Sequence, residues 1–439
     1  MRQPSACLSF FAFLSLALAA AGCRGVEETP AVPPYALAPL EEEGKEYRTP
    51  RAGEGFRTEV LGTDVAVQPR DRRSVSAWDA GAAVLAPGVS EGEVLPYASL
   101  FFWRHPDDMT FFRAIVAGVY NEVFFAKSAR ELRPLEGILT LNNFTVPIEE
   151  AQYVDGDRID EEELFWGRVH PGIGLGYREP LDEPGANDNM LAVSLIAEPG
   201  FLYFDGGADS APDFIEPRDT FEGRGRLQAR LDAMERNLLE LPHRGVATGG
   251  DLVYGWRARW DDWGRGAREG GGDSRDYVTF TGYMVGAGGV PFVRSERHRL
   301  LGSIHGGTGD ALDRFSGLRL GGGPSGDEYE SLARPVLPGA LIEEFITSHY
   351  AVAVGEYRWE PIFFAYLSVR TSLAYVERDR LSSGEVKARG DYLGSLGARI
   401  TMGVPLDMRL QLDYNYSAGV IRHGRHGGHE VVVHLSRQF

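Results

Sequence analysis

The strongest constraint on the fold of this chain is an alternation of apolar and polar residues with a period of two. Residues 409–417 alternate without a fault, and residues 251–260 place apolar and aromatic side chains on one face and Asp251, Arg257 and Arg259 on the other. Such a period is typical of half-buried β-strands. After residue 23 no apolar run reaches the roughly 18 residues that a membrane helix requires. The sequence therefore predicts an all-β protein.

Soluble β-sandwiches also contain alternating strands, but three features favour a transmembrane antiparallel β-barrel. The apolar faces often end in Trp or Tyr, the opposite faces are often fully charged, and the chain begins with a signal sequence. The 55 Gly, 23 Phe, 18 Tyr and 7 Trp residues fit tight turns and aromatic girdles at the membrane surface. Because single-chain bacterial barrels have an even number of strands, we predict 14 to 16, most simply about 16.

Further strand candidates lie along the whole chain after residue 92. They are 98–104, 111–125, 137–144, 164–177, 190–204, 224–232, 277–286, 299–306, 350–360, 363–377 and 392–402.

The C-terminal strand indicates where the barrel closes. Val431, Val433 and Leu435 share an apolar face, and the chain ends in Phe439. A terminal aromatic residue of this kind is similar to the closing strand of bacterial outer-membrane barrels, which predicts an outer-membrane location and contact with outer-membrane lipid. Arg437 falls on the same apolar face, where its guanidinium can reach the headgroups at the membrane edge.

The N-terminus has the features of a secretory signal peptide. Residues 1–22 contain Arg2, an apolar run and small residues. Ala20-Ala21-Gly22-Cys23 resembles a lipoprotein processing box, so we expect a lipid on Cys23; the alternative is cleavage at an Ala-x-Ala-type site that leaves an unmodified thiol. Residues 23–92 are proline-rich and polar, which predicts a periplasmic tether with a short strand or two near 56–67, followed by the barrel at 93–439.

Composition and motifs argue against nucleic-acid binding, phosphate-loop chemistry, metal binding and enzyme activity. A formal net charge of -18 argues against a nucleic-acid partner. Residues 321–326 are rich in glycine but lack the Lys-Ser/Thr of a phosphate loop. His423, His426 and His429 lie three apart without an adjoining acid or cysteine, so we expect a hairpin loop rather than a metal site. Ser303 and His305 share a strand face without an identifiable acid. We expect no enzyme activity and no cofactor.

A set of charged residues is expected to face the lumen. Its proposed members are Arg224, Arg226, Arg230, Arg257, Arg259 and Arg319, with Asp232, Asp251 and Asp413 as partners. Such a ladder holds a plug or loop in place, or gives a pore an anion preference. The alternative is structural, with paired charges in a lumen filled with side chains.

Four sequence features resemble the barrel of the BamA/TamA superfamily, the bacterial surface antigen family. Residues 230–245 resemble its strand–turn–strand element, 318–322 its Phe-x-Leu-Gly-Gly with Leu318 in place of the aromatic, and 403–414 its Gly-Pro-Leu strand entry; Phe439 is the fourth. The resemblance covers residues 220–439. It implies assembly or translocation of proteins or lipids at the outer membrane, through a weak seam between the first and last strands. The expected seam pairs 95–104 with 431–439, loosened by Gly427 and Gly428.

Two departures from the family limit this implication. The family's Arg-Gly-aromatic tripeptide follows Gly321 and Gly322, where this chain has Asp327 and Glu328, with Tyr329 as the nearest aromatic. Residues 24–92 have room for one small module rather than an array of POTRA domains, so client proteins or a separate POTRA-bearing protein are the expected partners. The alternative is a passive pore or structural barrel that has lost the assembly activity.

Overall fold

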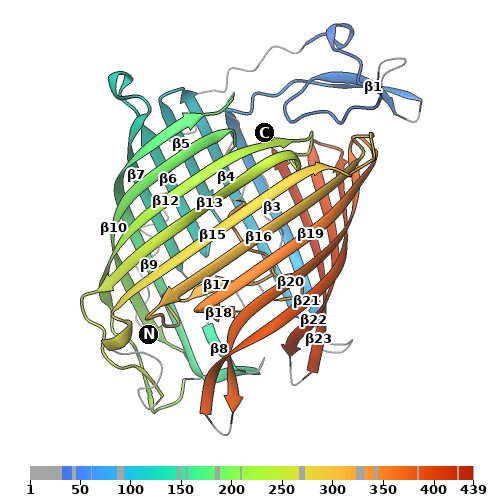
Figure 1. The fold of residues 1–439 in the computed structure, drawn as a ribbon. Helices are drawn as coiled ribbons and strands as arrows, with labels where there is room; N and C mark the ends of the chain where they lie inside the picture. Colours follow the sequence, from blue (N-terminus) through green and yellow to red (C-terminus); the bar gives the residue numbers. More distant parts are fainter. Residues whose placement is uncertain are drawn as a thin grey trace.

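In a computed structural model, the described residues are 32–41, 46–60, 62–86, 93–145, 150–154, 157–182, 188–207, 210–265, 272–322, 332–340, 345–382, 385–422 and 425–438. Within these residues, sixteen antiparallel strands close into one barrel (Figure 1), which confirms the predicted fold class and strand number. The first eight are β3 (Ser74–Ala86), β4 (Glu93–Asp107), β5 (Thr110–Val116), β6 (Tyr120–Lys127), β7 (Leu135–Thr145), β9 (Asp157–Pro180), β10 (Met190–Gly206) and β12 (Thr220–Arg236). The second eight are β13 (Pro242–Arg257), β15 (Asp276–Gly289), β16 (His298–Asp310), β19 (His349–Ile362), β20 (Ala365–Ser382), β21 (Glu385–Val404), β22 (Met408–Arg422) and β23 (Arg425–Gln438).

The remaining elements are short. Strand β8 (Glu150–Val154) pairs with the first part of β9, and three pairs of strands lie outside the wall: β1 (Phe56–Val60) with β2 (Thr63–Val67), β11 (Phe214–Ile215) with β14 (Gly264–Arg265), and β17 (Leu318–Leu320) with β18 (Phe345–Thr347). Three 3-10 helices are η1 (Pro34–Ala36), η2 (Arg130–Leu132) and η3 (Gly272–Ser274). Over the described part of the chain, no helix has the length and apolar character to cross a membrane.

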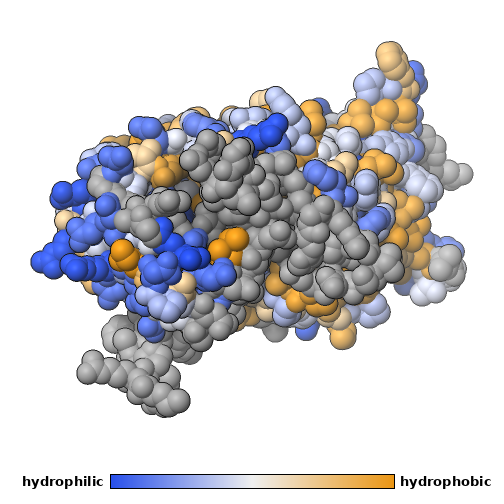
Figure 2. All heavy atoms as spheres, turned by 90° about the horizontal axis from the view of Figure 1, so that it is seen from below, coloured by the Kyte–Doolittle hydropathy of each residue, from blue (hydrophilic) through white to orange (hydrophobic). Residues whose placement is uncertain are grey.

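The two ends of the barrel differ. At the end that holds the β1–β2 hairpin and the C-terminal end of β23, several connections are tight turns, such as 108–109, 363–364 and 405–407. At the other end, the connection between β16 and β19 spans 311–348 (Figure 1). Seen from that end, hydrophilic side chains gather over one half of the surface (Figure 2). Outer-membrane barrels have their short turns on the periplasmic side, so we call the end with the short turns the periplasmic end.

The outside of the barrel is apolar at alternate positions of the strands. Large apolar side chains project outward from strands all around the wall; the most exposed of them include Ile173, Leu175, Leu195, Met284, Leu373 and Leu396. Tyr254 and Trp256 near the end of β13, and Tyr357 and Trp359 near the end of β19, are also exposed. An apolar band with aromatic residues near strand ends is the pattern of a barrel whose outer face lies in hydrocarbon.

The inside of the barrel is not uniformly polar. On the β3–β7 wall the inward-facing residues form a buried apolar cluster that includes Phe101, Trp103, Phe111 and Ile138. These side chains fill this part of the lumen, as apolar side chains fill the core of a soluble protein. Charged residues of the same wall have partners, as Glu122 has in Arg113 and Glu136 in Arg178, because an unpaired buried charge is costly.

The barrel begins earlier in the chain than the sequence predicted. Its first strand, β3, starts at Ser74, inside the segment assigned to the tether, whereas the short strands expected near 56–67 are present as β1 and β2. Strand β3 was missed because it is built mainly of alanine and glycine between Ala77 and Ala83. Such residues give almost no contrast between its two faces, so the period-two signal is weak.

The segment before β3 packs against the periplasmic turns. Phe56 is fully buried against Phe363 of the β19–β20 turn, with ring centroids 5.4 Å apart, and Leu238 of the β12–β13 turn joins the same cluster. Apolar side chains of β1 and β2 thus find a core on the barrel itself, although the segment is too small to form one alone.

Candidate functional site

The barrel closes through β3 and β23. Ten consecutive residue pairs, from His429–Ala86 to Gln438–Ala77, join the two strands without a register shift. The expected first strand at 95–104 is instead part of the second, β4, so the predicted seam was wrong on that side. On β23, Val431 and Val433 face outward and Val432 faces the lumen, as the alternation predicted. Phe439 lies outside the described residues.

The glycines expected to loosen this seam lie beyond it. Pairing with β3 stops at His429, because β3 ends at Ala86, and Gly427 and Gly428 are on the far side of that point. Gly427 has a φ of 89°, a conformation that favours glycine over other residues. These residues therefore shape the β22–β23 hairpin rather than the contact with β3.

A side chain from the second strand bridges the seam. The hydroxyl of Tyr97 on β4 lies 3.0 Å from Nδ1 of His434 on β23, and the two rings stack with centroids 5.9 Å apart. Between them lies Gly81 of β3, where a Cβ would clash with the Tyr97 hydroxyl and the Val433 carbonyl. Glycine at this position is what lets the bridge cross the first strand.

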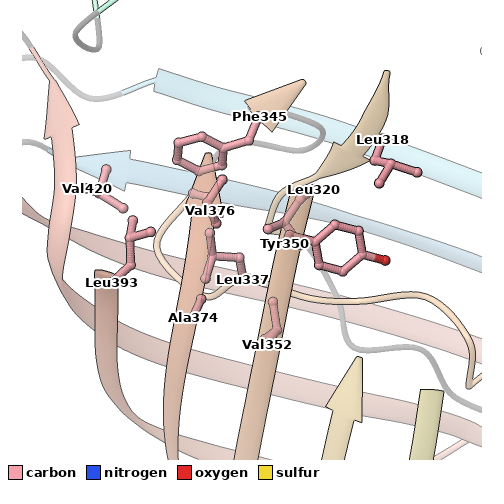
Figure 3. Close-up of a cluster of buried hydrophobic side chains, with 11 residues drawn as sticks. Leu318, Leu320, Leu337, Phe345, Tyr350, Val352, Ala374, Val376, Leu393 and Val420 are labelled. Atoms are coloured by element: carbon pink, nitrogen blue, oxygen red, sulfur yellow. The ribbon is translucent and has the colours of Figure 1, made fainter. Parts of the chain in front are cut away.

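The described parts of the connection 311–348 fold into the barrel. Leu318, Leu320, Leu337 and Phe345 from this loop are buried against apolar residues that project inward from β19 to β22 (Figure 3). The wall residues of this cluster are Tyr350, Val352, Ala374, Val376, Leu393 and Val420. Burial of several large apolar side chains at once fixes this part of the loop, which we call the lumen loop, on the inner wall.

The lumen loop is also bound to the last strand. The buried carboxylate of Glu430 on β23 accepts hydrogen bonds from the Gly339 amide and from Asn415 Nδ2, both at 2.9 Å. Gly339 has a φ of 87°, and a Cβ there would lie 2.5 Å from the Cβ of Ser417. A Cβ on Gly322 would lie 2.8 Å from Oε1 of Glu430. Both glycines permit close approach of the loop backbone to the wall.

The predicted loop motif lies partly at this contact. Gly321 and Gly322 are buried beside the Glu430 contact region, whereas Tyr329 lies outside the described residues. Sequence reasoning missed Glu430, because a single glutamate on an alternating strand does not indicate which loop it faces.

Part of the predicted charge ladder is present on the β10–β13 wall. Arg224 pairs with Glu198 at 2.9 Å, Arg226 pairs with Asp251 at 3.2 Å, and Arg230 also pairs with Asp251. The arginines lie on one strand and their acids on its two neighbours. Each of these three arginines therefore lies close to a carboxylate, although two of them share Asp251.

The other members of the ladder belong to separate groups. Arg257 binds Glu222 and Asp313, at 3.1 and 2.5 Å. Asp413 is bound by Arg399 on the opposite wall, at 2.6 Å.

Three further members also lie apart from the β10–β13 wall. Asp232 pairs with Arg236 at the periplasmic end of β12. Arg259 is exposed past the end of β13, outside the ladder, because the alternation ends where the strand does. The guanidinium of Arg319 lies over the Phe144 and Trp166 rings.

Ion pairs fasten the segment before β3 to the periplasmic end. Arg72 pairs with Glu240 of the β12–β13 turn at 2.7 Å and with Asp188 at 2.6 Å, and both acids are buried. The Thr49 amide donates to Glu296 at 3.0 Å. Burial alone raises the pKa of the Glu296 carboxyl, but hydrogen bonds from His243 and Thr49 together with nearby positive charge lower it to about 2. Sequence reasoning missed these contacts, since they join distant segments.

The histidine candidates have other partners. Nε2 of His305 lies 2.9 Å from the Leu332 carbonyl oxygen, and Ser303 and His305 line the same cavity, as their spacing predicted. Nδ1 of His429 lies 2.8 Å from the Tyr414 hydroxyl, and His423 lies outside the described residues. Where residues are described, no group of three or more His, Cys, Asp or Glu is arranged to hold a metal ion.

Comparisons with known proteins find solved barrel structures of low similarity. No protein-family model matches the chain, and no curated protein matches it significantly. BamA from Haemophilus ducreyi lacking POTRA domains 1–3 is similar with a TM-score of 0.48 and 10% identity, over 88% of this chain and 75% of that one. CdiB from Escherichia coli gives 0.46 and 10%, over 88% and 67%. OccK10 (OpdN) from Pseudomonas aeruginosa gives 0.33 and 10%, over 84% and 99%. Scores and identities this low assign neither a family nor an activity.

Proposed function

We propose that this chain is a bacterial outer-membrane barrel that assists the insertion or translocation of proteins or lipids. The apolar outer band supports the location, because a wall with this pattern is stable only against hydrocarbon. One observation carries the activity: the strand that closes the barrel also holds the lumen loop, through Glu430 and Gly339. Movement of β23 at the seam is therefore transmitted to the lumen loop through this contact, and displacement of the loop is transmitted to the seam.

The proposed route uses the edge of β3 or β23. When the two strands separate, each exposes unpaired backbone N–H and C=O groups, which can pair with an incoming strand. The Tyr97–His434 bridge and the ten backbone pairs hold the seam closed at rest. Clients, or a separate periplasmic protein, would supply the contacts that open it. Cys23, which lies outside the described residues, would add a lipid anchor on the same side.

A second candidate is a passive pore or structural barrel. The unbroken register of the β3–β23 pairing favours it, since nothing in that register marks a weak point. Both candidates predict a membrane-inserted barrel, so the test must measure opening of the seam.

The experiment locks the seam with a disulfide in a Cys23→Ser background. Ala83 and Val432 are directly paired across the seam, and both face the lumen. The matched control is Ala247 with Val285, an alanine–valine pair that also faces the lumen, on neighbouring strands β13 and β15. Side chains of such pairs are within reach of a disulfide. Each double-cysteine protein is reconstituted in liposomes and tested for acceleration of folding of a denatured barrel client.

We expect A83C/V432C to lose acceleration when oxidised and to regain it when reduced, whereas A247C/V285C keeps it in both states. No acceleration by the unmodified protein, together with a steady single-channel current, would establish the pore instead. Equal acceleration by both oxidised proteins would exclude a route through this seam.

A further inference from the structure

A second feature of the lumen is a cavity of about 120 Å³ between the lumen loop and the β19–β21 wall. Four arginines line it, Arg358, Arg370 and Arg399 from the wall and Arg334 from the lumen loop, and the wall contributes one acid, Glu356. We propose that this cavity binds an oxyanion, either a phosphate or a carboxylate group. The inference does not rest on the assembly activity and holds equally for a pore.

The acids of this wall do not neutralise its arginines evenly. Asp413 is held by Arg399, whose Nε and one terminal nitrogen each lie 2.6 Å from its oxygens, and Gln411 also donates to it. Arg370 comes no closer than 3.5 Å to the same carboxylate. One acid is thus fully engaged by one arginine, in the bidentate geometry that guanidinium prefers.

Glu356 does not satisfy the other two arginines. Its Oε1 accepts a hydrogen bond from the Ser368 hydroxyl at 2.8 Å. The distances from its oxygens to Nε of Arg370 and Nε of Arg358 are 3.6 and 3.8 Å. Three positive charges therefore face two negative ones, and two of the three lack a close carboxylate.

Two donors of this wall are left without acceptors. The Nε atoms of Arg358 and Arg370 are buried and have no hydrogen-bond partner among the described residues. A buried donor of this kind costs about 1–3 kcal/mol when it is left unpaired, so an acceptor in the cavity is favoured. Oxyanions present several acceptor atoms and match guanidinium groups in both charge and geometry.

The β10–β13 wall provides an internal comparison. There Arg224, Arg226 and Arg230 each lie within 3.2 Å of a carboxylate oxygen. The two walls therefore differ in distance rather than in charge count, because Arg358 and Arg370 lie 3.5 Å or more from the nearest carboxylate oxygens of Glu356 and Asp413. A single buried water needs about 10–15 Å³, so the cavity has room for a small oxyanion with its remaining waters.

The test is titration calorimetry with inorganic phosphate and, separately, with acetate, on the folded full-length protein in detergent at constant ionic strength. We expect saturable binding of at least one of them. Arg370→Gln should weaken it about tenfold or more, because a charge-assisted hydrogen bond is lost, and Arg370→Lys should recover part of it. The matched control is Arg226→Gln on the opposite wall, which should bind as the unmodified protein does.

Folding of every variant is verified by heat-modifiable mobility on gels. Absence of saturable binding to the unmodified protein, or equal loss in R370Q and R226Q, would overturn the proposal. A third arm neutralises Asp327, Glu328 and Glu330. Binding that appears only in this variant would show that acids of the chain itself occupy the cavity, and the proposal of an exchangeable anion site would fail. The phosphate and acetate arms distinguish the two ligand classes.

Discussion

Removal of the Glu430 carboxylate should release the lumen loop from the wall. The Gly339 amide donates to this carboxylate at 2.9 Å, and the carboxylate is buried. A hydrogen bond to a charged acceptor contributes about 1.5–3 kcal/mol, and the unpaired amide would cost about 1–3 kcal/mol more. Glu430→Ala therefore weakens loop attachment by about 3 kcal/mol, which raises the detached fraction about 100-fold. Glu430→Gln keeps an acceptor oxygen and should raise it only about fivefold, since it loses charge assistance alone.

The assay measures maleimide labelling of a reporter cysteine at Ala340, a buried loop residue, in a Cys23→Ser background. When detachment is fast compared with labelling, the rate follows the detached fraction. The matched control is Glu198→Ala, which removes another buried lumen glutamate, one that pairs with Arg224 on the β10–β13 wall. It should leave the labelling rate unchanged. The reasoning is refuted if folded E430A labels at the rate of the parent protein.

Three further predictions concern the periplasmic end and the seam. Arg72→Ala leaves Glu240 buried without one of its partners and should free the segment before β3, which limited proteolysis would detect as faster cleavage. The pKa of Glu296 is about 2 in the folded protein against 4.5 in the unfolded chain. The ionised carboxylate therefore contributes its full stabilisation of the folded state above pH 4.5, and this contribution is lost as the pH falls toward 2. Cleavage of the segment before β3 should accelerate over that interval. Gly81→Val displaces Tyr97 and should destabilise the barrel by about 2 kcal/mol or more, whereas Tyr97→Phe removes one hydrogen bond and costs about 1 kcal/mol; urea unfolding measures both.

Each of these predictions has a contrary outcome. Unchanged cleavage in R72A would mean that apolar packing of Phe56 alone holds the segment. Constant cleavage between pH 4.5 and 2 would exclude Glu296 as a fastening group. Equal unfolding midpoints for G81V and the parent protein would mean that the bridge over the seam contributes no stability.

Strongly alternating segments were predictable because their side-chain contrast is local. Residues 251–257 and 431–438 have the faces that the alternation assigned to them, and Ser303 and His305 share the lumen side. The alternation failed where contrast was absent, in the alanine-rich β3, and where a strand ended, at Arg259. The alternation of a strand does not indicate which other strand it pairs with. The seam was therefore assigned to β4 instead of β3.

The sequence alone determined that the chain is a barrel with two-faced strands, because the period of two is a property of neighbouring residues. Only the tertiary structure decided which side chains and which loop fill the barrel. Glu430 meets Gly339 across 91 positions of the chain, and Arg72 meets Glu240 across 168. Such contacts follow from barrel closure and from the path of the lumen loop, which bring distant segments together whatever the local pattern. The two arginines of the β19–β21 wall that lack a close carboxylate, Arg358 and Arg370, are likewise apparent only when strands become neighbours.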